Sequence, residues 1–178
     1  LNEFFKAEPK EKGKPETARF IHENDVQKWL ELIQGKGNIV DGLKMGNDKP
    51  PMPFSDVTLK NSLTHTVWYL PSVAACFAMG TLLRSASNKF FEVIVCAGTK
   101  AGIGIDALPP VKAKMGDPLK TKTITLSCGK LMTGVTVRPW TGIFMLCNLK
   151  SPETYFQSAF RVQSPWTTVN NEGKMEII

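Results

Sequence analysis

The stretch "THTVWYLPSVAACFAMGTLLRSA", Thr64 to Ala86, decides the fold. Its first seven residues are mostly β-branched or aromatic, which is typical of a buried strand. Pro71 and Ser72 interrupt the run, and Ser72 is placed to cap the alanine-rich helix that follows. Residues 66–83 carry no charge, but the proline-serine break divides them into a strand, a turn and a helix instead of one membrane span. The stretch therefore predicts a strand over 64–70, a helix over 72–86 and no membrane partner.

The same alternation continues to the end of the chain. Further strands are expected over 90–98, 122–128 and 140–149, and a helix is expected after Ser151. Only a poor helix is expected from "LPPVKAKMGD" (108–117), because two prolines interrupt it. Near-continuous apolar strands separated by helices indicate an α/β fold with a mostly parallel open sheet flanked by helices. This domain is predicted to cover residues 61–178.

Residues 1–60 have a different texture. The first twenty are rich in Lys, Glu and Pro and are expected to form a flexible arm, and "NDVQKWLELIQGKGN" (24–38) predicts one short amphipathic helix. We interpret this segment as an irregular or helical connector. Because the chain begins at Leu1, we expect it to be a piece of a longer protein.

Charge and cysteine content restrict the partners. The 178 residues carry a net charge of +6, and the excess lies in residues 61–178, where twelve Lys and Arg face six Asp and Glu. A positive field suits nucleic acid or nucleotide, although a merely basic soluble domain would look the same. Four scattered cysteines indicate free thiols in a reducing, cytoplasmic setting, and two histidines make a metal site improbable.

Self-sufficient nucleotide sites are not indicated. Gly102, Gly104 and Ala107 have the dinucleotide spacing, but Pro109 and Pro110 interrupt the helix that should hold the pyrophosphate. Two glycine pairs resemble a phosphate loop but lack the lysine after the second glycine, and the chain has no Asp-Glu box. The chain alone is therefore not expected to hydrolyse ATP.

Two segments remain as candidates. The first, "CGKLMTGVTVRPW" (128–140), follows a buried strand, and open α/β sheets bind ligands at the ends of their strands. It offers glycines, threonine hydroxyls and cations to a ligand. The alternative is a tight turn with solvated charges. The second, "SPETYFQSAFRVQSPW" (151–166), begins as a capped helix. Its polar residues form one stripe, and we expect its apolar remainder, including Tyr155, Phe156 and Phe160, to pack on the sheet.

These segments together resemble a known family. "KTITLSCGKLMTGVTV" (122–137) looks like motif V of superfamily-2 helicases, "YFQSAFRVQSPW" (155–166) like motif VI, and "THTVWYLPS" (64–72) like motif IV. The resemblance covers roughly residues 62–168 and implies the second RecA-like motor domain of a DNA helicase or translocase, most like helicase-like subunits of restriction or phage-defence systems.

The resemblance also implies roles for individual residues. Arg161 would be the arginine finger and Gln157 would orient it or touch the nucleotide, and the nucleotide would also meet Gly134 and Thr136. Contacts to the nucleic-acid backbone would come from Ser72, Thr99, Lys100, Lys130 and Thr133. ATP and Mg²⁺ would be held mainly by a first RecA-like domain of the same parent chain, and DNA is the expected partner, with RNA left open.

The chain departs from the family pattern at three positions. Phe160 stands where motif VI has glycine, Ser164 where it has a second arginine, and Thr136 where motif V has aspartate. Arg161 is then the one arginine left to act as finger, with a salt-bridge partner at the edge of the core as its structural alternative. From another class, a non-catalytic α/β module that binds nucleotide or nucleic acid is the rival function.

Overall fold

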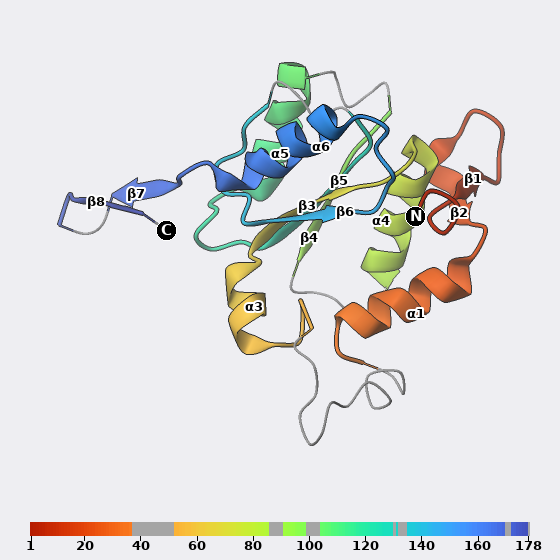
Figure 1. The fold of residues 1–178 in the computed structure, drawn as a ribbon, viewed down its shortest axis with the longest axis horizontal. Coiled ribbons are helices and arrows are strands. Elements are labelled where there is room, and N and C mark those ends of the chain that lie inside the picture. Colours follow the sequence, from red (N-terminus) through yellow and green to blue (C-terminus); the bar gives the residue numbers. More distant parts are fainter. Residues whose placement is uncertain are drawn as a thin grey trace.

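The computed structural model describes residues 1–36, 52–85, 91–98, 104–129, 131, 135–169 and 172–177. A four-stranded parallel sheet forms its centre, in the order β4-β5-β3-β6 (Figure 1). The strands are β3 (His65–Tyr69), β4 (Glu92–Cys96), β5 (Thr123–Ser127) and β6 (Gly142–Met145). Each lies inside a range predicted from the sequence, so the prediction of an α/β fold with a parallel sheet and flanking helices is confirmed.

One face of the sheet is covered by α4 (Val73–Ser85) together with the N-terminal segment. Val67 and Tyr69 point away from this face, whereas Trp68 and Leu70 point into it, as expected from the two-residue period of a strand. The helix approaches the sheet closely at Gly80, because a Cβ there would lie 2.8 Å from Val95 Cγ2.

The N-terminal segment is folded and shares this core. It consists of β1 (Ala7–Pro9), a 3-10 helix (Pro15–Thr17), β2 (Ala18–Phe20) and α1 (Glu23–Ile33). Phe5, Phe20 and Trp29 belong to the same apolar cluster as Trp68, whose ring lies 5.9 Å from that of Trp29. The expectation of a flexible arm over residues 1–20 was therefore wrong, because three aromatic side chains outweigh the polar composition around them.

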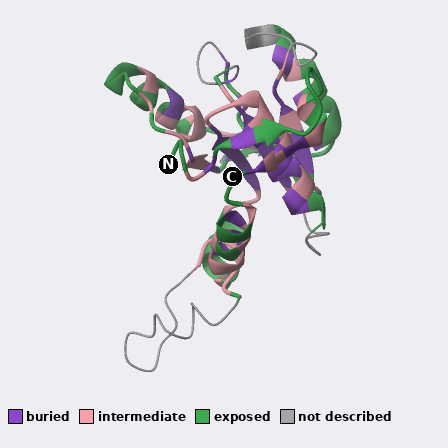
Figure 2. Cartoon of the chain, turned by 90° about the vertical axis from the view of Figure 1, so that its right-hand side faces the viewer, coloured by how far each residue is buried: buried purple, intermediate pink, exposed green. Residues whose placement is uncertain are grey.

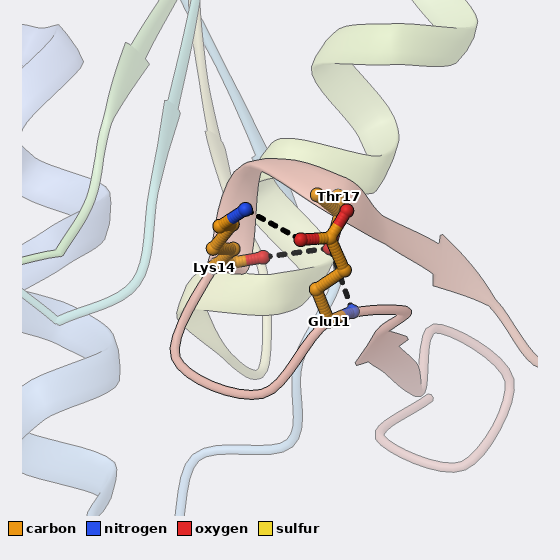
Figure 3. A network of polar contacts seen from close by, with 3 residues as sticks. All are labelled: Glu11, Lys14 and Thr17. Carbon is orange, nitrogen blue, oxygen red and sulfur yellow. Dashed lines mark hydrogen bonds and ion pairs between the residues drawn. The ribbon is translucent and has the colours of Figure 1, made fainter.

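Local polar contacts close the turn between β1 and β2. Lys14 pairs with Glu11, and the Thr17 hydroxyl both accepts from the Glu11 amide at 3.1 Å and donates to the Lys14 carbonyl at 2.8 Å (Figure 3). These contacts satisfy the backbone groups of a turn that the charged composition alone had suggested to be unstructured.

The opposite face carries α5 (Leu108–Met115), α6 (Pro152–Ala159) and the segment that leads into β6. The first turn of α5 contains both Pro109 and Pro110. Proline is tolerated there because amides of the first turn need no helical partner, so the prediction of a poor helix was wrong. Figure 2 shows the buried residues gathered along the sheet and the inner sides of its helices.

The remaining elements are peripheral. A short helix α3 (Val57–Ser62) precedes β3 and is capped by Asp56, and a 3-10 helix (Gly104–Ala107) leads into α5. A second 3-10 helix (Phe160–Gln163) continues α6, and the hairpin β7 (Thr167–Val169) with β8 (Met175–Ile177) projects from the body (Figure 1). Among the described residues, no helix is long and apolar enough to cross a membrane.

Candidate functional site

The carboxyl ends of the parallel strands form one edge with a cavity of about 420 Å³. Ser72, Gly129 and Asn148 line it, following β3, β5 and β6 respectively. Ser72 caps α4 as predicted, since its hydroxyl accepts from the Ala75 amide at 3.1 Å. The N-terminus of a thirteen-residue helix, whose first amides favour anions, is thereby fixed beside this cavity.

Two glycines turn the chain at this edge in a conformation that other residues rarely adopt. Gly98 after β4 has φ +81°, and Gly129 after β5 has φ +78°. The predicted phosphate contacts Thr99, Lys100 and Lys130 directly follow these turns, and Thr133 lies four residues after Gly129. These four residues and Gly134 lie outside the described residues. The described flanks bring both turns to the edge where Ser72 lies.

The thiols also gather at this edge, which the sequence did not reveal. Cys128 and Cys147 line the cavity half-buried, and Cys76 and Cys96 are buried nearby. A hydrogen bond between the Cys76 thiol and Cys128, together with burial, raises the pKa of Cys76, and burial raises that of Cys147. The prediction of free thiols is confirmed. No group of three His, Cys, Asp or Glu able to hold a metal occurs within the described ranges.

Arg161 lies beneath the segment that resembles motif V. Its guanidinium Nη1 donates to the Val135 carbonyl oxygen at 2.5 Å, a contact between residues 26 apart in sequence. Its Nε is buried and has no hydrogen-bond partner among the described residues. The salt bridge considered as its structural role is not formed in that part of the chain, because the acceptor is a neutral carbonyl. Thr136, exposed, directly follows this carbonyl.

Tyr69 provides the floor below Arg161. Its hydroxyl donates to the Leu131 carbonyl at 2.9 Å and is buried. Burial raises the pKa of Tyr69 above its usual range, while the positive charge of Arg161 opposes the rise. The phenol therefore stays neutral and offers the Arg161 guanidinium no counter-charge.

Gln157 does not reach Arg161. Its side chain is exposed and donates to Glu153 Oε1 at 2.9 Å, one turn earlier on α6. The role expected for Gln157, to orient Arg161 or to contact the nucleotide, therefore stays a prediction. Because Gln157 is exposed, a ligand placed over the outer side of α6 could reach it.

The orientation of α6 is the reverse of that expected from its sequence. Tyr155, Phe156 and Phe160 are 47%, 56% and 58% exposed, whereas Ser158 is fully buried. The Ser158 hydroxyl donates to the Thr154 carbonyl at 2.8 Å, which satisfies it inside the helix. The prediction that the aromatic residues pack on the sheet was wrong, because the smaller side chains let the helix approach the body more closely. We call Tyr155, Phe156 and Phe160 the aromatic face.

Two hydroxyls under this layer were not singled out from the sequence. Thr125 Oγ1 and Ser127 Oγ on β5 are buried, and each lacks a hydrogen-bond partner within the described residues. They pair in register with Val67 and Tyr69, which places them on the side of the sheet that Arg161 covers. A buried hydroxyl without a hydrogen-bond partner costs free energy, so the hydrogen-bonding capacity of these two side chains is not fully used in this structure.

Comparison with known proteins gives one relation. No family model and no solved structure matches the chain. A protein of Mycoplasma pneumoniae is 32% identical to this chain over 162 residues. Its name, which was assigned by prediction, describes the C-terminal part of a type II restriction enzyme and methyltransferase. The match covers 88% of this chain and 21% of the relative, so the chain spans about a fifth of that protein. This relates the chain to a restriction-modification protein, and the relative's name includes no motor activity.

Proposed function

We propose that this chain is the second motor domain of an ATP-dependent DNA translocase that serves a restriction-modification enzyme. The observation that carries the proposal is the contact of Arg161 with the Val135 carbonyl. It joins the two segments that resemble motifs VI and V, across 26 residues, on a parallel sheet of the expected kind. The family resemblance implies that both segments face one nucleotide, and this contact supports the proposal because it places them side by side.

DNA is the proposed nucleic acid, because the relative is named as a type II restriction enzyme and methyltransferase. A cytoplasmic setting is proposed on the free thiols. The strand would cross the carboxyl edge, where the α4 N-terminus and the Gly98 and Gly129 turns lie. Lys100, Lys130, Thr99 and Thr133 would add contacts to phosphates and not to bases. Binding by the chain alone should therefore weaken steeply with added salt and depend little on sequence, as titrations with duplexes of two unrelated sequences would show.

ATP and Mg²⁺ would be held mainly by a first motor domain. The residues described here fit a supporting part, since they supply a cation, an amide and a hydroxyl but no carboxylate cluster able to bind a metal ion. Arg161 would stabilise the negative charge that develops on the transferred phosphate, an effect worth about 10³–10⁵ in rate where such arginines have been measured. Thr136 and Gln157 would contact the nucleotide beside it.

Arg161 must turn outward to act in this way. Its present anchor is one neutral carbonyl, and its buried Nε is unpaired among the described residues, so the inward position is not fully satisfied. A phosphate offers charge-assisted, two-pronged hydrogen bonds that a carbonyl does not. We propose that closure of the first domain over the exposed side of α6 draws the guanidinium from Val135 to the nucleotide.

The aromatic face supports the need for a covering domain. Tyr155 and Phe156 meet edge to face at 5.7 Å, and Phe156 and Phe160 stack at 6.4 Å, so the three rings form one contiguous exposed patch. Gln157 is exposed on the same helix between them. The first motor domain, carrying the nucleotide, is the proposed cover for this patch.

The rival function, a non-catalytic α/β module that binds nucleotide or nucleic acid, is favoured by the inward position of Arg161. The reading frame of the parent protein distinguishes the translocase from the non-catalytic module. A translocase requires Gly-x-x-x-x-Gly-Lys-Ser/Thr and an Asp-Glu box before residue 1, and their absence there refutes the proposal. With both present, the purified parent should hydrolyse ATP faster when duplex DNA is added and displace a triplex-forming strand. A rate of ATP hydrolysis that does not change when DNA is added would favour the non-catalytic module as the function of this chain.

A further inference from the structure

A second cavity, of about 460 Å³, lies on the α5 side of the molecule, away from the carboxyl edge. Its floor is apolar, with Met115 and Val137 buried, and Trp166 forms part of its wall. None of its lining residues belongs to the cavity beside Ser72. We call it the Trp166 cavity. Its size falls in the range of sites that hold small ligands, about 300–1,000 Å³.

Two cations flank the Trp166 cavity. Lys112 comes from the last turn of α5 and Arg138 from the segment before β6, and both are exposed. Within the described part of the chain neither has an ion-pair partner, and no carboxylate lines the cavity. The neighbouring Asp117 is engaged elsewhere, by Lys120 at 3.1 Å and by the Leu119 amide.

Two carbonyls at the C-terminal end of α5 are already hydrogen-bonded. The Lys112 carbonyl accepts from the Gly116 amide at 3.0 Å, and the Met115 carbonyl accepts from the Thr121 hydroxyl at 2.6 Å. Carbonyls that are already bonded repel an anion less than free ones do. The charged side chains that line the cavity are the two cations Lys112 and Arg138.

Trp166 is held from behind by a fixed histidine. The His65 ring meets the Trp166 ring edge to face at 6.4 Å. His65 is fully buried, with Nδ1 2.9 Å from Thr123 Oγ1 and Nε2 2.8 Å from the Pro118 carbonyl. Burial lowers the pKa of His65, so its ring is neutral at pH 7 and adds no charge. The indole is thus a preorganised aromatic wall that remains half-exposed.

We propose that the Trp166 cavity binds a nucleoside phosphate, with the base stacked on Trp166 and the phosphate held between Lys112 and Arg138. An aromatic wall beside a pair of unpaired cations is the combination that recognises a base together with its phosphate. The hydroxyls of Thr136 and Thr167 line the same cavity and can bond the sugar or phosphate oxygens. Apart from Thr136, the site lies outside the proposed motor contacts, and it needs no first motor domain.

The nucleoside phosphate has two sources, a free nucleotide or one unit of a DNA strand. The 178-residue chain is titrated with AMP in one arm and with single-stranded dT8 in the other, by calorimetry and by tryptophan emission. At least one probe should bind with a Kd below about 1 mM. Saturation by AMP alone identifies a free nucleotide, whereas saturation by dT8 identifies a strand. The proposal is overturned if neither AMP nor dT8 binds with a Kd below about 1 mM.

Variants place the binding at this cavity. Trp166→Ala should weaken binding about fivefold or more, since the loss of one stacking aromatic ring typically reduces affinity by at least that factor. Trp166→Phe should keep most of the affinity but lose the emission change. Lys112→Ala with Arg138→Ala should weaken binding about tenfold, whereas Lys28→Ala with Lys6→Ala, on the N-terminal segment, should not. Because Lys112 and Arg138 are exposed, folding is not at risk. Equal affinity in the cavity variant and its control contradicts the proposal.

Discussion

Replacing Phe156 and Phe160 together by glutamine tests the reversed orientation of α6. Fully burying a phenylalanine stabilises a protein by about 1.5–3 kcal/mol, but these two side chains are 56% and 58% exposed and lose less than half of their surface to the protein. Part of that lost surface is the contact of the two rings with each other. Glutamine also has a slightly better helix propensity than phenylalanine. We therefore expect the double variant to lose at most about 1 kcal/mol.

The assay is thermal and urea unfolding of the chain. For a domain of this size about 1 kcal/mol corresponds to 2–4 °C in melting temperature. Leu126→Ala is the matched control, because Leu126 is fully buried in the sheet and should lose about 2–5 kcal/mol. If Phe156 and Phe160 packed on the sheet, as their sequence pattern suggests, each loss would be about 3–5 kcal/mol. A double variant that unfolds, or that loses as much as Leu126→Ala, refutes the orientation described here.

Two further predictions concern stability. The buried His65 has a lowered pKa, so the unfolded chain binds the extra proton first. The contribution of His65 to stability should be constant above about pH 6.5 and fall as the pH drops below it, by up to about 1.4 kcal/mol per pH unit. Urea unfolding of His65→Gln should therefore show a flatter profile between pH 7.5 and 5.5. A wild-type profile without that fall would show that His65 can be protonated in place. Gly80→Ala should destabilise by about 1–2 kcal/mol although alanine is the better helix former, because the new methyl group meets the stiff Val95 side chain. Adding Val95→Ala should remove the clash, so that the better helix propensity of alanine at position 80 shows as a gain in stability. A Gly80→Ala variant that is more stable than wild type would show that α4 can shift outward.

The sequence predicted those parts of the fold that local signals determine. Four strands and α4 follow from apolar runs broken by Pro71 or by glycines, and the Ser72 and Ser151 caps were placed correctly. The α5 helix was expected only as a poor helix, because proline stops a helix in its interior but not in its first turn, and the sequence does not reveal which turn is the first. The N-terminal fold was missed because its order comes from contact with Trp68, which lies far along the chain.

The candidate site was predicted only in part, for a related reason. The periodicity of α6 showed two stripes, but periodicity cannot tell which stripe meets the body, and here Ser158 does. The contact of Arg161 with Val135 was not predicted, because residue spacing does not show which backbone carbonyl a side chain 26 residues away will meet. The thiols at the carboxyl edge and the Trp166 cavity arise from strands and helices that are brought together only by the sheet order β4-β5-β3-β6.

The most direct test of the translocase proposal is ATP turnover by the parent protein carrying Arg161→Lys. Lysine keeps the charge but loses the planar fork that meets two phosphate oxygens. We expect turnover to fall by about a thousandfold, with nucleotide affinity and melting temperature nearly unchanged. Arg84→Lys is the matched control, because Arg84 Nη2 also donates to a backbone carbonyl, that of Val93 at 2.9 Å, far from the proposed nucleotide. If Arg161→Lys turns over ATP within a fewfold of wild type, as Arg84→Lys should, Arg161 is a structural residue and the motor assignment is contradicted.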